Sequence, residues 1–186
     1  MKPNKLLVPF ILTFIVSISV GCDQSSSKKS EENVAATIKD SLHGQKQLTT
    51  EEKEAIKKII SARVAEIVAG VTNKKIDSAL KPYLNYPEFL LVTPDARITN
   101  YPEMIEEQRS FARQVSDANF TTIKEDFLFL GNDLVMCTWK GKYEYKLKNG
   151  EKYLIDPYVG SMLFRKANDL WSIVYAHEST GAAVKQ

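Results

Sequence analysis

The chain has 186 residues, of which 44% are hydrophobic and 26% are charged, so it can form one domain around a single core. Of its 25 basic residues, two lie in residues 1–21, which have no acidic residue, so 23 basic and 23 acidic residues remain after that segment. This balance gives no electrostatic reason to expect nucleic acid as a partner.

The first residues have the pattern of a secretory signal. Lys2 and Lys5 precede a mostly apolar run, residues 6–20, which is too short to cross a bilayer core that needs about 20 residues. The sequence Ser19-Val20-Gly21-Cys22 then resembles the end of a bacterial lipoprotein signal, in which a peptidase cuts before a lipidated cysteine. The resemblance implies that residues 1–21 are removed and that Cys22 carries the lipid. The alternative is an ordinary signal with an incidental cysteine.

Residues 22–46 are predicted to be the lipidated cysteine and a flexible polar tether, because the segment has no aromatic residue and little to bury. We expect a lipid-anchored protein of the bacterial cell envelope whose domain faces the periplasm or the exterior. Asp23 resembles an inner-membrane retention signal that only some lineages use, so the choice of membrane stays open. Cys137 would then be the remaining cysteine, without a disulfide partner or CxxC metal spacing, and we expect it to be a buried hydrophobe.

Two helices are predicted at the start of the domain. Thr49 and Glu52 fit a capping box, and apolar residues then recur every three or four positions to about Thr72. A second, short helix is expected over residues 74–81, where Pro82 ends it because proline lacks the backbone N–H that a helix needs.

Two short strands, residues 88–93 and 96–99, are expected next, followed by a helix that begins near Pro102 and ends near Asp117. The rest predicts an antiparallel meander, because turn signals that include Asn149-Gly150 separate long apolar segments. Such long strands should be strongly curved, and Pro157 should mark a bulge or an edge. The strands are expected over residues 119–130, 133–147, 151–166 and 170–179.

The C-terminal sequence Trp171-Ser172-Ile173-Val174, followed by His177-Glu178-Ser179, resembles the end of nuclear transport factor 2-like (NTF2-like) domains, in particular SnoaL-like and DUF4440-type bacterial members. The order of elements from about Thr49 to Thr180 is also similar. The resemblance implies an α+β fold, a cone of three N-terminal helices packed on a strongly curved antiparallel sheet of about six strands. It places the domain at residues 47–182, with a short tail at 183–186. It also implies a homodimer through the outer face of the sheet, but says little of activity.

Alternation along the strands predicts which residues line the inside of the cone. In the last strand, alternate residues from Trp171 to Ser179 should share that face. An aromatic interior with a few polar groups is typical of a small-molecule pocket, and equally of a filled core. Six residues are expected to line the pocket: Phe127, Trp139, Tyr143, Tyr158, Met162 and Tyr175.

Asp156 and His177 are the candidate catalytic residues. Asp156 lies in an apolar strand, where burial would raise its pKa and make it a usable base, unless the Asp156-Pro157 step forms a bulge that faces water. His177 titrates near neutrality but could instead tie the strand end to neighbouring backbone. A hydrolase triad with Ser179 is excluded, since residues two apart on a strand are about 6–7 Å apart and no nucleophile elbow is present.

We expect a membrane-anchored domain that binds a small, partly apolar ligand without catalysis, cofactor or metal. One alternative is a scaffold for protein interaction or dimerisation in the cell envelope. Another is an isomerase, cyclase or dehydratase with Asp156 or His177 as proton shuttle. Isomerases of the resembled family use a hydrogen-bonding tyrosine or acid, and the first expected helix carries no aromatic residue.

Overall fold

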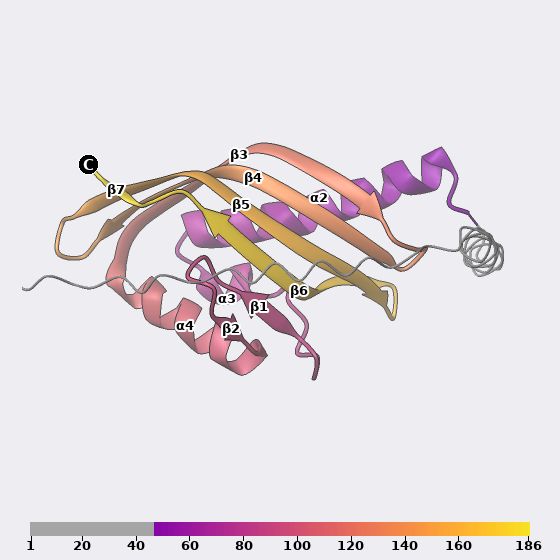
Figure 1. Ribbon diagram of the computed structural model, residues 1–186, viewed down its shortest axis with the longest axis horizontal. Helices are drawn as coiled ribbons and strands as arrows, with labels where there is room; N and C mark the ends of the chain where they lie inside the picture. The colour runs from indigo at the N-terminus through magenta and orange to yellow at the C-terminus, as the bar shows by residue number, and fades with distance from the viewer. Residues whose placement is uncertain (1–46) are drawn as a thin grey trace, which may run out of the picture. The chain divides into compact units, whose positions relative to one another are not determined.

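The computed structural model describes residues 47–186; the predicted signal peptide (1–21), the lipidation site Cys22 and the tether (22–46) lie outside the described residues. No helix within 47–186 is long and apolar enough to cross a membrane. Helices come first and a strand meander follows (Figure 1). The elements are α2 (Thr50–Thr72), α3 (Ile76–Ala79), β1 (Leu90–Val92), β2 (Ile98–Thr99), α4 (Tyr101–Gln114), β3 (Val115–Phe129), β4 (Leu134–Leu147), β5 (Lys152–Ala167), β6 (Leu170–Thr180) and β7 (Val184–Lys185).

The two long helices begin at capping boxes. The predicted box at Thr49 is present, with the Glu52 backbone N–H donating to the Thr49 hydroxyl over 3.1 Å. A second box, between Asn100 and Glu103, starts α4. This helix ends at Gln114 rather than near Asp117, because the chain becomes extended at Val115 and pairs there with β4.

The strands form one sheet in the order β2-β1-β6-β5-β4-β3, and β7 pairs with β5. The four long strands lie within one residue of their predicted bounds, except that β3 starts four residues earlier. One pairing differs from the prediction of an antiparallel sheet, because β1 runs parallel to β6. The reason lies just upstream, where Tyr83 already bridges Ile173 in the parallel direction and sets the course of the chain along β6.

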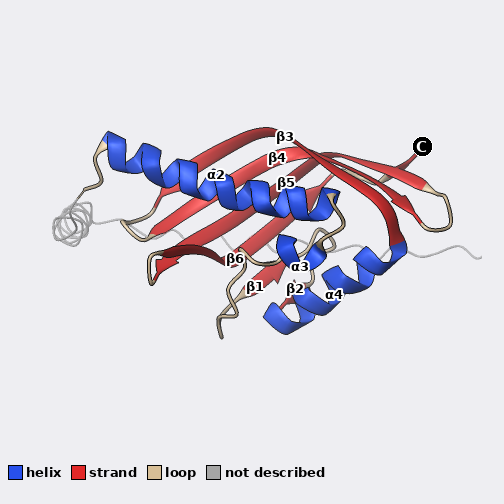
Figure 2. Cartoon of the chain, turned by 180° about the vertical axis from the view of Figure 1, so that it is seen from behind, coloured by secondary structure: helices blue, strands red, loops and turns tan. Residues whose placement is uncertain are grey.

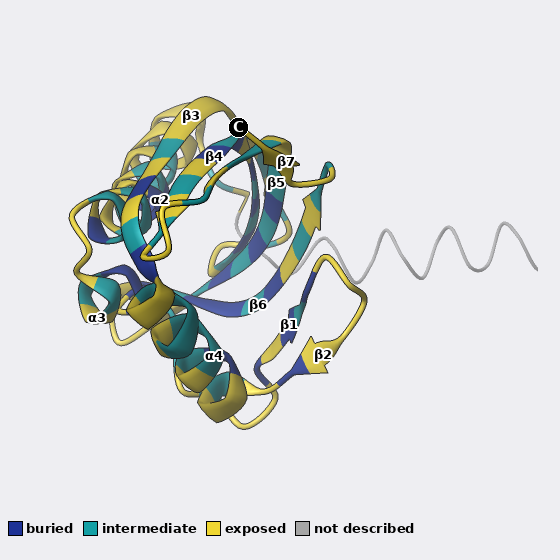
Figure 3. Ribbon diagram, turned by 90° about the vertical axis from the view of Figure 1, so that its left-hand side faces the viewer, coloured by how far each residue is buried: buried dark blue, intermediate teal, exposed yellow. Residues whose placement is uncertain are grey.

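The sheet curls around its concave face, and the three helices lie on that side (Figures 2 and 3). Register shifts interrupt each long strand pair, which is expected where strands bend strongly. One of them lies at Asp156-Pro157, so the predicted bulge at Pro157 is present; the peptide bond there is cis. The fold is therefore the predicted α+β arrangement, with an open, mixed sheet in place of an antiparallel one.

The core lies between α2 and the concave face of the sheet. Ile60 and Val64 of α2 are buried against sheet residues that include Val135, Phe164 and Ile173. A second, smaller cluster lies where α4 passes into β3. The helices and the curved sheet enclose a cavity whose lining includes residues of both clusters.

A bulge in β6 changes which side chains face the interior. Ile173 and Tyr175 pair with adjacent residues of β5, so Val174 is an extra residue without a partner of its own. The predicted alternation is therefore wrong beyond Ile173, because Ala176 and Glu178 are the residues that face inward. The residues moved away from the interior are Tyr175, His177 and Ser179.

Candidate functional site

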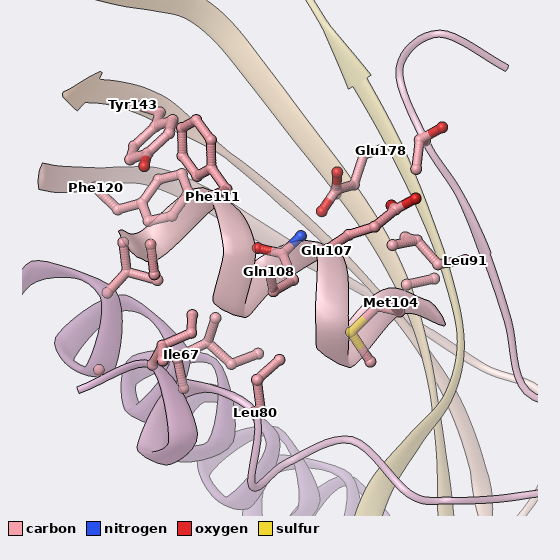
Figure 4. A pocket seen from close by; sticks show the side chains of 18 of the residues that line it. Ile67, Leu80, Leu91, Met104, Glu107, Gln108, Phe111, Phe120, Tyr143 and Glu178 are labelled. Carbon is pink, nitrogen blue, oxygen red and sulfur yellow. The ribbon is translucent and has the colours of Figure 1, made fainter. Parts of the chain in front are cut away.

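A cavity of about 690 Å³ lies between the concave sheet and the helices α2, α3 and α4. This volume is typical of sites for drug-sized molecules, which are concave and mostly apolar. Figure 4 shows side chains that converge on it from α2, from α4 and from the strands of the sheet. Its aliphatic and sulfur-containing wall includes Ile67, Val68, Leu80, Leu91 and Met104.

Aromatic rings form the opposite wall of the cavity. Phe120 stacks on Tyr143 with ring centroids 4.2 Å apart, and it meets Trp139 and Tyr158 edge to face at 5.5 and 5.4 Å. The Trp139 indole N–H donates to the Thr122 hydroxyl over 2.9 Å, so its one polar group is satisfied. These contacts hold the rings in fixed orientations while their apolar surfaces border the open space.

Gly160 keeps part of this space open. It pairs with Trp139 on one side and with Glu178 on the other, and it is buried on the concave face. A Cβ atom at this position would meet nothing within 4 Å. The absence of a side chain at Gly160 therefore adds room directly beside Glu178.

Glu178 is the acidic group inside the cavity. Burial raises the pKa of its carboxyl, and the nearby Tyr158 hydroxyl opposes that shift in part by hydrogen bonding. Burial also raises the pKa values of Tyr83 and Tyr158, and the charge of Glu178 adds to both shifts. The two phenols therefore stay protonated and can donate hydrogen bonds.

A network of charged side chains lies at the edge of the cavity. Arg97 donates to Asp95 over 2.7 Å and to Glu107 over 2.6 Å. Hydrogen bonds from Thr93 and then Arg97 lower the pKa of the Asp95 carboxyl to about 2. One guanidinium thus binds both acids of this network, and Gln108 on α4 points its amide toward the cavity (Figure 4).

Four of the six predicted pocket residues line this cavity: Trp139, Tyr143, Tyr158 and Met162. The other two do not. Phe127 packs against the main core, and Tyr175 lies beyond the β6 bulge on the outer side of the sheet. Whether the four lining residues bind a ligand remains a prediction.

The structure places both predicted catalytic residues away from the cavity interior. Asp156 is exposed at the β5 bulge, where its carboxylate pairs with the Lys142 ammonium over 2.7 Å. His177 borders the cavity but is exposed, because the β6 bulge turns it outward. The two are therefore not brought together, and the interior carboxyl is Glu178.

Sequence reasoning missed Glu178 and Tyr83. One signal could have drawn attention to Glu178, which is an acid two residues after the mostly apolar stretch 173–176. Its inward orientation depends on the bulge at Val174, which the sequence does not mark with a glycine or proline. Within residues 47–186, no cluster of three or more His, Cys, Asp or Glu side chains could hold a metal ion.

The chain has the NTF2-like fold, in which a curved mixed sheet encloses a cavity against three helices. Solved structures share it at low identity, which shows the fold alone. A LinA type 3 hexachlorocyclohexane dehydrochlorinase from Novosphingobium barchaimii has TM-score 0.64 and 11% identity over 74% of this chain and 94% of its own.

Two further structures are similar. A candidate scytalone dehydratase from Novosphingobium aromaticivorans has TM-score 0.66 and 4% identity over 73% of this chain and 91% of its own. An NTF2-like superfamily protein from Salmonella enterica has TM-score 0.62 and 14% identity over 70% and 94%. No protein-family model matches the sequence, and no curated protein matches it.

Proposed function

We propose that this protein binds a small, largely apolar molecule in the cavity of its NTF2-like domain, without transforming it. The observation that carries the proposal is a cavity of about 690 Å³ lined mainly by aromatic and aliphatic side chains. Such a site gains affinity from apolar burial and orientation from its polar groups. A binding role also agrees with the positions of Asp156 and His177, which leave a single carboxyl in the interior.

Tryptophan fluorescence tests this proposal, because only one of the two tryptophans borders the cavity. Trp139 lines it, whereas Trp171 is buried in the main core. Apolar compounds that enter the cavity should change the emission of the wild type and leave the emission of Trp139→Phe unchanged. Equal changes in both proteins, or no change with any compound of a broad library, would contradict the proposal.

We propose that Cys22 carries a lipid that holds the domain at a membrane of the cell envelope. The basic start, the short apolar run and the cysteine that follows support this. In a bacterial host, a clickable palmitate analogue should label the wild type, and the wild type should sediment with membranes. Cys22→Ser should lose both properties, and a membrane-bound, labelled Cys22→Ser protein would contradict the assignment.

Acid–base catalysis is the second candidate function, and the observation that favours it is the buried Glu178 carboxyl beside the Tyr158 hydroxyl. A carboxyl whose pKa is raised by burial is a stronger base than an exposed one. Two structures of similar fold are described as a dehydrochlorinase and a candidate dehydratase, names that denote elimination reactions. Turnover of a bound compound that disappears in Glu178→Gln, with binding retained, would favour this alternative over simple binding.

An apolar row across the outer face of the sheet favours a homodimer. Strand register aligns Leu128, Met136, Leu163, Tyr175 and Leu90 on five neighbouring strands. The two ends of the row are 61% and 42% exposed, which is a high value for leucine. A second copy that packs its own row against this one would bury both.

Light scattering after size-exclusion chromatography checks the dimer. We expect Met136→Lys to convert a dimer into a monomer, and Asn119→Lys, an exposed change near the other end of β3, to leave the mass unchanged. A monomeric wild type would refute this part of the proposal and leave the cavity unaffected.

A further inference from the structure

Glu178 differs from the other two acids that line the cavity, because no basic side chain pairs with it among residues 47–186. Asp95 and Glu107 share the guanidinium of Arg97. Around Glu178, the groups that act on the carboxyl are the surrounding protein, which desolvates it, and the Tyr158 hydroxyl. A buried carboxylate without a countercharge is costly, and an incoming cation would offset that cost.

The walls near Glu178 suit a cation as well. Tyr158 lies beside the carboxyl and meets Phe120 and Trp139 edge to face, with ring centroids 5.4 and 6.0 Å apart. Aromatic faces attract ammonium groups through the ring quadrupole, most strongly where water is excluded. One carboxylate next to several aromatic rings is thus a chemistry that fits a protonated amine.

The charged side chains that line the cavity also favour a cation as the ligand's head group. Its three acids face two basic side chains, Arg97 and Lys74. Arg97 already pairs with the two acids at the edge of the cavity, and the Lys74 ammonium donates to the Ser116 carbonyl over 3.3 Å at the start of β3. The lining therefore has one more acid than it has basic side chains, so with Glu178 ionised it favours cations over anions.

There is also room for a head group at this point. Gly160 pairs directly with Glu178, and a Cβ atom on Gly160 would have nothing within 4 Å. An ammonium group placed here would reach the carboxylate from the cavity side, with the apolar body of the ligand along Phe120, Tyr143 and the aliphatic wall.

From this geometry we infer that the cavity selects a protonated amine on an apolar body, with Glu178 as its countercharge. The inference rests on the proposed binding function and names the chemical class of the ligand. A neutral hydroxyl compound of the same shape would fill the cavity but leave Glu178 without a charged partner. A carboxylate of the same shape would be repelled.

Isothermal titration calorimetry at pH 7.5 with three matched probes tests the inference on the chain carrying Cys22→Ser. The probes are 4-phenylbutylamine, 4-phenylbutanol and 4-phenylbutanoate, which differ only in the head group. We expect the amine to bind about ten- to hundredfold more tightly than the alcohol, as charge-assisted hydrogen bonds imply, and the carboxylate to bind most weakly.

Substitutions test whether Glu178 causes the preference for the amine over the alcohol. Glu178→Gln should bring the affinity for the amine to within about threefold of that for the alcohol, and Glu178→Asp should retain most of the amine preference. Glu144→Gln, an exposed change on β4 outside the cavity, should bind like the wild type. Near-ultraviolet circular dichroism checks that each variant is folded.

Two results would overturn the inference alone: equal binding of amine and alcohol to the wild type, or an amine preference that survives in folded Glu178→Gln. The proposed function would still stand in either case, because the alcohol binds. If none of the three probes binds the wild type, the inference fails, and the tryptophan-fluorescence screen with a broad library decides the proposed binding function separately.

Discussion

Two glycines on the concave face of the sheet should respond in opposite ways to the same substitution. Gly160 faces the cavity, with nothing within 4 Å of an added Cβ. Gly141, on the neighbouring strand, lies under Trp139, and a Cβ there would be 2.3 Å from the indole ring and 2.4 Å from the Thr121 carbonyl oxygen. The pair therefore separates open space from filled core within one layer of the structure.

The magnitudes follow from these distances. Replacing a strand glycine with alanine gains roughly 0.5–1 kcal/mol where the site is free. Leucine at position 160 adds apolar burial worth about 1.5–3 kcal/mol when complete, and roughly half of that against an open cavity. We expect Gly160→Leu to raise the free energy of unfolding by about 1–2 kcal/mol, or the melting temperature by about 3–6 °C. Gly141→Ala should lower the free energy by about 1–3 kcal/mol through overpacking.

Urea denaturation followed by circular dichroism measures both changes, and thermal melts give the melting temperatures. Gly160→Leu should also abolish the response of Trp139 to apolar compounds, since it occupies the space beside that ring. The reasoning is refuted if Gly160→Leu destabilises the protein by more than about 1 kcal/mol while Gly141→Ala is neutral, because the interior would then be packed at Gly160.

Three further predictions concern stability and reactivity. Gly70→Ala should lower the free energy of unfolding, measured in urea, by about 1–3 kcal/mol, because an added Cβ would be 2.5 Å from the Ala79 backbone. This loss should exceed the gain of about 1 kcal/mol that alanine brings to a helix. A stabilised variant would show that α3 does not pack against Gly70. Burial, with a smaller contribution from nearby acids, raises the pKa of the Cys137 thiol to about 12. Iodoacetamide at pH 8 should therefore label Cys137 only in urea, which peptide mass spectrometry can establish. Rapid labelling of the native protein would exclude the buried position. Because the pKa of Glu178 is raised, its contribution to stability is present at low pH and is lost as the pH rises through that pKa. The free energy of unfolding of Glu178→Gln should therefore decline less from pH 5 to pH 8 than that of the wild type. Parallel pH profiles of the two proteins would refute the assignment.

The sequence predicted most of the secondary structure because the signals for it are local. The capping box at Thr49 starts α2, and turn residues such as Asn149-Gly150 and Asn168-Asp169 separate the long strands. The bulge at Pro157 was also predictable, since proline cannot join a regular ladder. The resemblance of the last strand to NTF2-like domains gave the fold itself.

Features set by pairing between distant segments were not predictable. The parallel course of β1 depends on the bridge between Tyr83 and Ile173, which are far apart in the sequence. The bulge at Val174 depends on the register against β5, and a shift of one residue moves every following side chain to the other face. That shift is why His177 was a candidate from the sequence and Glu178 was not.

Native mass spectrometry of the purified protein tests the central claim, ligand binding in the cavity, most directly. The wild type and Gly160→Leu should be prepared side by side from the same bacterial host and sprayed under conditions that retain bound molecules. We predict that a small molecule accompanies the wild type and is lost from Gly160→Leu, because the added side chain fills the space beside Glu178. Identical spectra, with both proteins free of ligand or with the same adduct on both, would contradict the claim that this cavity holds a ligand.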